Sequence, residues 1–183
     1  EGDRGVALPL WWREPVQHDH RGDQVRRADR NDIDFINEVL NDPDVRPHVF
    51  EGSEPLDIEP HFDYFLVWVT EFGVLIAEAV GNGRYIALVA FKRGGWGQHA
   101  IIAQRHAMDE LFATTDCSVL SATCFENNKR GVANLIATMN DVETIGDCVI
   151  AETTWDQWAR NSIATRKRGE SFSGYDRHVK NML

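Results

Sequence analysis

The first regular pattern of hydrophobic and polar positions along the chain is helical. Between positions 27 and 41, apolar side chains recur at three- and four-residue spacing, which predicts one amphipathic helix on Ile33, Ile36, Val39 and Leu40. Asp29 or Asn31 has the side chain of an N-cap, and Pro43 ends the helix near Asn41. The next segment, 51–60, is acidic and holds two prolines, so we expect a loop, or a loop with a short turn, there.

Three apolar runs follow this loop, at 65–70, 73–80 and 84–91. They have the length of strands, and Gly81-Asn82-Gly83 separates the second run from the third. An Asn-Gly step between apolar runs is a strong signal for a tight hairpin turn. The sequence therefore predicts an antiparallel meander of three strands.

After the meander, the pattern returns to the period of a helix. Apolar residues from Ile101 to Phe112 follow helical spacing, and a short strand is expected at 118–124. Asn127 and Asn128 then cap a second helix that ends near Met139, and 144–154 has the pattern of a returning strand or hairpin. The order helix, meander, helix, strand, helix, strand predicts an α/β or α+β sandwich on a mainly antiparallel central sheet.

Both ends of the chain differ in composition from the middle. We therefore expect one domain at 26–159, between an N-terminal arm at 1–25 and a basic C-terminal tail at 160–183. The arm carries the apolar cluster LPLWW, in which Trp11 and Trp12 are expected to pack on the domain or on a neighbouring subunit. No segment has the pattern of a membrane span or of a signal peptide, which predicts a protein that is neither membrane-bound nor secreted.

Charge is distributed unevenly along the chain. The formal net charge of -10 argues against a general nucleic-acid-binding surface. The tail, however, has a net charge of +4, which leaves -14 for the remainder; its cations are Arg160, Arg166, Lys167, Arg168, Arg177 and Lys180, and its acidic residues are Glu170 and Asp176. Such a tail is either a solvated end or a docking segment whose Arg166, Lys167 and Arg168 contact an acidic partner or nucleic acid.

A glycine-rich stretch, Lys92-Arg93-Gly94-Gly95-Trp96-Gly97, lies between the meander and the following helix. Glycines let backbone amides approach a phosphate closely, and the helix N-terminus presents the positive end of its dipole. In this position the stretch resembles the Q/R-x-x-G-x-G/A loop of the GNAT superfamily of acetyl-CoA-dependent N-acyltransferases. The resemblance implies a GNAT-like fold and acetyl-CoA as cofactor, which would be held by Lys92, Arg93, Gly95, Gly97, Gln98 and His99.

Two further stretches extend this resemblance to about 26–158. In CFENNKRGVANLIATM, Asn127 or Asn128 is similar to the superfamily asparagine that opens the helix after the fifth strand and helps to hold the pantetheine arm of the cofactor. NEVLNDPDVRPHV and ATTDCSVLSATC are similar to a branch that is found in tailed bacteriophages and their prophages. The resemblance thus implies a phage-type member of the superfamily.

The expected catalytic positions differ from those of an active enzyme. An acyltransferase of this type removes a proton from the attacking amine with a carboxylate, or with a water held by one, on or near the fourth strand. That strand has Ile86 and Leu88 at the expected polar positions, and no tyrosine lies between Tyr85 and Tyr175 to protonate the departing thiolate. Trp96 is expected to fill the space of the pyrophosphate, with a lid over a ligand as the alternative.

Few residues remain as candidates for catalysis or metal binding. Glu78 is the strongest base candidate, because strand alternation would direct it into the cleft, and Glu126 is the other. His99 and His106 fall on one helix face but have no third ligand nearby, so no metal site is predicted. The three cysteines form no CxxC pair and are expected to be small buried residues in a reducing compartment.

Two functional hypotheses follow. In the first, the chain is a virion-associated protein of a tailed phage, of head or connector type, that keeps the GNAT fold as a rigid block with weakened or lost chemistry. It would bind other virion proteins, or itself, through the arm and the tail. In the second, it is an N-acetyltransferase of the host cytoplasm that transfers acetyl from acetyl-CoA to a primary amine, with Glu78 or Glu126 orienting a water as base. Cofactor binding separates the two hypotheses, because either function can be built on this fold.

Overall fold

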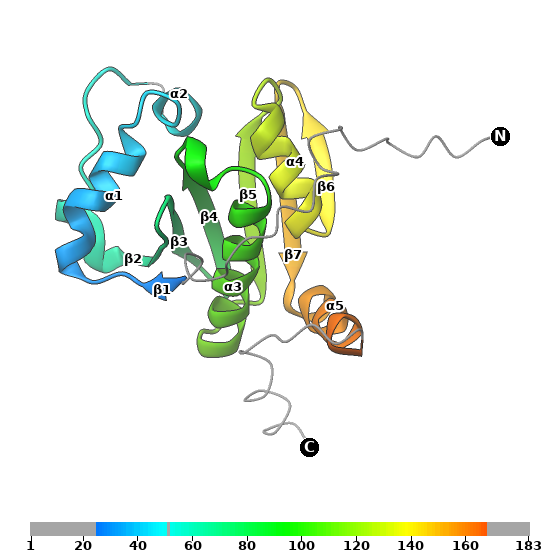
Figure 1. Ribbon diagram of the computed structural model, residues 1–183. Coiled ribbons are helices and arrows are strands. Elements are labelled where there is room, and N and C mark those ends of the chain that lie inside the picture. Colours follow the sequence, from blue (N-terminus) through cyan, green and yellow to red (C-terminus); the bar gives the residue numbers. More distant parts are fainter. Residues whose placement is uncertain (1–24, 51, 168–183) are drawn as a thin grey trace.

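The computed structural model of the chain describes residues 25–50 and 52–167 (Figure 1). The predicted arm, with Trp11 and Trp12, lies outside the described residues except for Val25. The part of the predicted tail that begins at Arg168 also lies outside them. Within the described ranges, no helix is long and apolar enough to cross a membrane.

A mixed sheet of seven strands forms the centre of the described fold. The strands are β1 (Arg26–Arg27), β2 (Phe65–Val69), β3 (Gly73–Gly81), β4 (Arg84–Phe91), β5 (Val119–Phe125), β6 (Asp141–Ile145) and β7 (Cys148–Thr154). They lie in the order β1-β2-β3-β4-β5-β7-β6, and β4 and β5 are parallel while the other neighbouring pairs are antiparallel. This arrangement confirms the predicted mainly antiparallel sheet.

Helices flank the sheet on both faces (Figure 1). α1 (Ile33–Leu40) and α2 (Arg46–Val49) lie on one face; α3 (Gln98–Thr114), α4 (Lys129–Thr138) and α5 (Trp155–Lys167) lie on the other. Short 3-10 turns at Arg30–Asp32, Glu59–Tyr64 and Arg93–Gly95 precede α1, β2 and α3. Each face has its own core: Ile36, Val39, Val67 and Val74 belong to the α1 side, and Leu111, Phe112, Leu120 and Trp158 belong to the α3 side.

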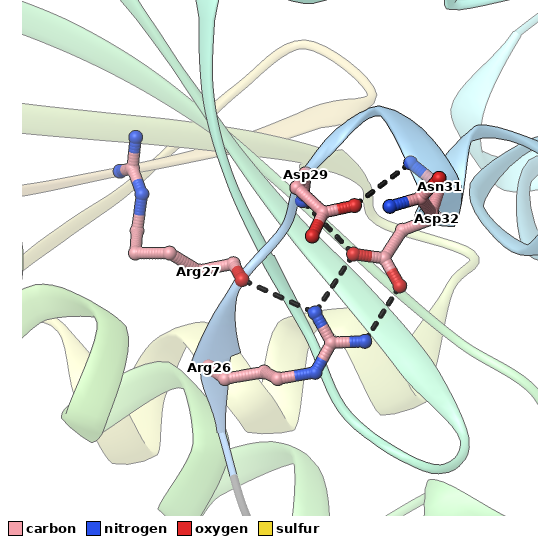
Figure 2. A network of polar contacts seen from close by, with 5 residues as sticks. All are labelled: Arg26, Arg27, Asp29, Asn31 and Asp32. Atoms are coloured by element: carbon pink, nitrogen blue, oxygen red, sulfur yellow. Dashed lines mark hydrogen bonds and ion pairs between the residues drawn. The ribbon is translucent and has the colours of Figure 1, made fainter.

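A polar network fixes the 3-10 turn that leads into α1 (Figure 2). The Asp29 carboxylate accepts a hydrogen bond from the Asn31 amide at 2.8 Å, and the Asp32 carboxylate accepts one from the Asp29 amide at 2.9 Å. The Arg26 guanidinium donates to both oxygens of Asp32, at 2.7 and 2.6 Å, and lowers the pKa of that carboxyl. Of the two predicted caps, Asp29 is therefore the one that the structure uses, because Asn31 lies within the capped turn.

The predicted meander is confirmed as β2, β3 and β4. In its second turn Gly81, Asn82 and Gly83 have φ angles of 95°, 53° and 68°, the left-handed conformations that favour glycine and asparagine. The segment expected to return to the sheet at 144–154 is a hairpin, β6 and β7, and it begins at Asp141.

The helix α5 crosses the predicted boundary between domain and tail at residue 159. Trp155, Trp158 and Ala159 pack against the α3-side core. The Trp158 ring stacks on Phe112 with 5.3 Å between centroids, and its indole Nε1 donates to Asp109 Oδ1 at 2.7 Å. These contacts extend the folded unit, so that the helix runs on to Lys167.

Candidate functional site

The parallel strands β4 and β5 define the candidate site. Their ladder pairs residues 84–87 with residues 119–122 and ends at Ala87 and Ala122, although both strands continue beyond this point. The unpaired halves therefore diverge toward their carboxyl ends, where β4 leads into α3 and β5 leads into α4. Figure 1 shows α3 and α4 in front of these two strands. We call this unpaired region of backbone between β4 and β5 the gap, and the starts of the two helices its mouth.

The glycine-rich loop at 92–97 lies at this mouth. Gly95 is buried, and a Cβ on it would meet the Phe72 side chain at 2.6 Å and the Phe91 ring at 2.7 Å. Gly97, the residue before α3, has φ 77° and ψ -123°, a conformation that side chains rarely adopt. Close packing therefore explains why residue 95 is a glycine, without any ligand. The positive φ angle explains why residue 97 is a glycine.

The N-terminus of α3 is the part of the loop that could hold an anion. The first amides of a helix have no intrahelical acceptor, and they carry the positive end of the dipole. Here these amides belong to Gln98, His99 and Ala100. The His99 ring packs edge-on against Phe72, with 6.3 Å between centroids.

The two predicted cofactor-binding cations contact acidic residues on the α1 side. Lys92 Nζ lies 2.7 Å from Glu38 Oε1 and 5.4 Å from the Phe35 ring centroid. Arg93 Nε lies 4.0 Å from Asp44 and is 80% exposed. Loss of the exposed pair with Asp44 would cost Arg93 only about 0–1 kcal/mol. Lys92 is held more closely.

Trp96 joins the two sides of the mouth. Its indole Nε1 donates to the carbonyl oxygen of Phe91, the last residue of β4, at 2.7 Å. The guanidinium carbon of Arg130, in the first turn of α4, lies 3.8 Å from the centroid of the Trp96 ring. A guanidinium at this distance makes a favourable cation–π contact. Trp96 and Arg130, which we call the Trp96–Arg130 clasp, therefore link the end of β4 to the start of α4.

The two asparagines of the predicted α4 cap have different environments. Asn128 is the N-cap, and its Oδ1 accepts a hydrogen bond from the Gly131 amide at 3.0 Å. Asn127 is exposed, and its carbonyl oxygen accepts from the Lys129 amide at 3.0 Å. The prediction of an asparagine cap is confirmed at Asn128, whose side-chain oxygen is therefore committed to the helix.

The two candidate bases lie far apart. Glu78 is opposite Ile86 in the β3–β4 ladder, and both side chains are exposed. Glu126 is also exposed and follows the end of β5, five residues beyond Ser121, the β5 partner of Ile86. At the rise of a strand this separation is about 16 Å. The structure does not bring Glu78 and Glu126 together, and Leu88, the other apolar replacement, packs against the α1-side core.

Sequence reasoning missed a polar cluster beside Glu78. The Glu152 Oε1 atom, on β7, accepts hydrogen bonds from Arg84 at 2.6 Å and from the Ser121 hydroxyl at 2.7 Å. Ser121 is paired with Ile86 on one side and with Glu152 on the other. Only the sheet order assembles this cluster, because its members are 31 residues or more apart from Glu152 in sequence. It places a second oriented carboxylate on the face that carries Glu78.

The described part of the chain supports neither metal binding nor nucleophilic catalysis by Cys117 or Cys124. No group of three or more His, Cys, Asp or Glu side chains there could hold a metal ion. Burial, followed by the charge of Asp116, raises the pKa of the Cys117 thiol to about 12. Burial likewise raises the pKa of Cys124. Both thiols are therefore poor nucleophiles at neutral pH.

One hollow of about 300 Å³ lies at the edge of the sheet, away from the gap. It is lined by Arg26, Asp32, Phe35, Val69, Thr70 and Glu71. None of these residues belongs to β4, β5 or the loop at 92–97.

Comparison of the sequence with protein-family models and with curated proteins gives no match. Solved structures are similar in fold. Spermidine N-acetyltransferase from Vibrio cholerae, in complex with CoA and spermine, has a TM-score of 0.60 and 15% identity, covering 74% of this chain and 96% of that chain. A variant of that enzyme has a TM-score of 0.62 and 13% identity, covering 76% and 99%. A domain from Methanocaldococcus jannaschii has a TM-score of 0.58 and 15% identity, covering 72% and 97%.

Identities this low show the fold alone. With its mixed sheet, its diverging β4–β5 pair and helices on both faces, the chain has the GNAT-type acetyltransferase fold.

Proposed function

We propose that this chain is a GNAT-fold protein whose cofactor gap is closed by its own side chains, and that it serves as a structural, virion-associated protein of a tailed phage. The observation that carries the proposal is the Trp96–Arg130 clasp. It spans the mouth between the end of β4 and the start of α4, where the resemblance implies that the pyrophosphate of acetyl-CoA would bind. The similarity of the sequence to a phage-type branch supplies the biological context.

The energetic effect of the clasp can be estimated from its two contacts. Displacing Trp96 would break a hydrogen bond of about 0.5–1.5 kcal/mol. It would also break a cation–π contact of about 0.5–1 kcal/mol. Together these losses weaken CoA binding roughly 5- to 70-fold. The clasp therefore weakens binding strongly, and the apolar Ile86 and Leu88 on β4 weaken the chemistry separately.

A thermal shift experiment tests this proposal. A ligand present at 100 times its dissociation constant stabilises a protein by about 2.7 kcal/mol. We expect acetyl-CoA at millimolar concentration to leave the melting temperature of the wild-type chain unchanged. The Trp96→Phe variant, which keeps the ring and loses the N–H donor, is the matched control for the hydrogen bond. A clear stabilisation of the wild-type chain would refute the closed gap.

A second candidate function is acetyl transfer from acetyl-CoA to a primary amine. It is favoured by the diverging β4–β5 pair and by the positive end of the α3 dipole next to Gly97. In this case Trp96 would be a lid, and Glu78 would orient the water that accepts the amine proton, with Glu152 as a second carboxylate on the same face. Loss of turnover in Glu78→Gln, with CoA binding retained, would favour this candidate over the first.

The proposed virion role needs a separate test. The chain should be found in purified particles of the phage that encodes it, at a fixed stoichiometry to the other structural proteins. If the chain is absent from such particles, the proposed virion role is wrong, even if the chain does not bind CoA.

A further inference from the structure

The face of β5 and β7 that is turned away from α3 and α4 has no covering layer among the described residues. Alternate residues of these strands, Leu120, Ala122, Val149, Ala151 and Thr153, are buried on the helical side. Their neighbours on the opposite side, among them Ser121, Thr123, Ile150 and Glu152, are half-buried or exposed. The helix α1 contacts β3 and β4, so it covers only the other half of this face.

The strand registers show which residues share this open face. Glu78 pairs with Ile86, Ile86 with Ser121, Ser121 with Glu152, and Glu152 with Asp141, which forms one row across five strands. The next positions add Glu143, opposite Ile150, and Ile145, opposite Cys148. We call this set the open face; its members used below are Glu78, Ile86, Asp141, Glu143, Ile145, Ile150 and Glu152.

The open face combines negative charge with exposed apolar surface. Four carboxylates lie on it, and Arg84, which binds Glu152, supplies one positive charge. Between them Ile86 is 46% exposed and Ile145 is 54% exposed. Large apolar side chains on a sheet face are normally covered in sandwich folds. The residues therefore suit an occupant with positive charges and apolar side chains in close succession.

We propose that the C-terminal segment of the same chain, residues 177–183, docks on the open face. This segment reads RHVKNML: it has two cations, Arg177 and Lys180, no acidic side chain, and three apolar residues. The N-terminal arm at 1–24 has five acidic residues and three arginines, so its charge opposes docking on the same face. Charge complementarity thus selects the C-terminal segment over the arm.

The chain is long enough for this docking. α5 begins directly after β7, the strand that carries Glu152 and Ile150, and its 13 residues span about 20 Å. Residues 168–176 can extend for about 30 Å. This is sufficient to return along the roughly 20 Å of the helix and to pass around the edge of the sheet onto the other face, since a layer packed on a sheet lies roughly 10 Å from it. The docked segment would cover Ile86, Ile145 and Ile150 and would face the four carboxylates.

Methyl NMR of isoleucine tests this proposal on the full chain. Deleting residues 177–183 should shift the methyl signals of Ile86, Ile145 and Ile150. Ile136, which is 59% exposed on α4, on the other side of the sheet, is the matched control and should not move. The double variant Arg177→Glu/Lys180→Glu should produce the same shifts, whereas Arg168→Glu should not. High salt should move the full-length signals toward those of the deletion, because the exposed charge pairs are screened.

Each other outcome would overturn the proposal. Shifts at the three methyls no larger than that at Ile136 would show that the segment does not occupy the face. Shifts that depend on protein concentration, together with a dimer mass in sedimentation, would assign the occupant to a second copy. If the deletion also moved Ile36, which is fully buried, it would have perturbed the fold, and the double charge variant would then decide.

Discussion

The buried contact between Trp158 and Asp109 gives the most quantitative test of how α5 is held. Trp158 Nε1 donates to Asp109 Oδ1 at 2.7 Å, and Asp109 is 2% exposed. The change Trp158→Phe keeps a ring that can stack on Phe112 and removes the donor. Leaving a buried acceptor without its donor costs about 1.5–3 kcal/mol. The smaller ring also gives up roughly 40 Å² of apolar contact, or about 1 kcal/mol at ~25 cal/mol per Å².

We therefore expect Trp158→Phe to lower the free energy of unfolding by about 2.5–4 kcal/mol. For a chain of this size the loss corresponds to a fall in melting temperature of about 5–16 °C. Urea unfolding followed by far-ultraviolet circular dichroism measures the loss without depending on tryptophan fluorescence. An unchanged dependence on urea would show that the unfolded state is the same.

A matched substitution at Trp68 separates the hydrogen bond from the loss of ring area. Trp68 is 2% exposed, compared with 6% for Trp158, and its Nε1 donates to Glu110 at 2.9 Å. The Glu110 side chain, however, is 40% exposed, so water can replace the lost donor. Trp68→Phe should cost about 1–2 kcal/mol less than Trp158→Phe. Equal losses in the two variants would refute the argument that the buried carboxylate of Asp109 makes the difference.

Three further predictions concern other buried or paired groups. Gln104 is 2% exposed, and its side-chain amide has no hydrogen-bond partner among the described residues. Gln104→Met should therefore raise the free energy of unfolding in urea titrations by about 1–2 kcal/mol. A decrease in that free energy would show that the amide has a partner. The pKa of Cys117 is raised to about 12, so between about pH 9 and pH 12 only the thiol of the unfolded chain ionises. The free energy of unfolding should therefore fall in this window by up to about 1.4 kcal/mol per pH unit. Cys117→Ala should remove this contribution to the pH dependence. Because Arg26 lowers the pKa of Asp32, the stabilisation by this carboxylate is present above about pH 4 and is lost as the pH falls. Asp32→Asn should therefore lower the free energy of unfolding by about 1 kcal/mol at pH 7. An equal effect of the substitution at pH 2 would contradict the ion-pair explanation.

The order of elements could be predicted from the sequence because each rests on a local pattern. The turn at Gly81-Asn82-Gly83 requires positive φ angles, and the cap at Asn128 requires a short polar side chain; both signals are visible in a few consecutive residues. A few consecutive residues also locate the glycine loop. Whether the loop binds a cofactor cannot be predicted in this way, because Gly95 is required by its close contact with Phe72, more than twenty residues earlier.

The contacts that decide the site are long-range and leave no local signal. Glu152 joins Arg84 and Ser121 only because β7 inserts between β5 and β6, an order that hydrophobic periodicity does not encode. Arg130 has the pattern of an ordinary exposed helix cation, yet it packs on Trp96. The helix α5 was missed as well, since basic and polar residues dominate its sequence while a few tryptophan and alanine side chains anchor it.

Calorimetric titration of CoA into the wild-type chain and into Trp96→Ala shows whether Trp96 closes the gap between β4 and β5. We expect no measurable heat for the wild-type chain up to about 1 mM CoA. We expect Trp96→Ala to bind CoA roughly 5- to 70-fold more tightly, because the clasp no longer has to be displaced. Micromolar binding by the wild-type chain, weakened by the substitution, would contradict the claim and identify Trp96 as part of a working cofactor site.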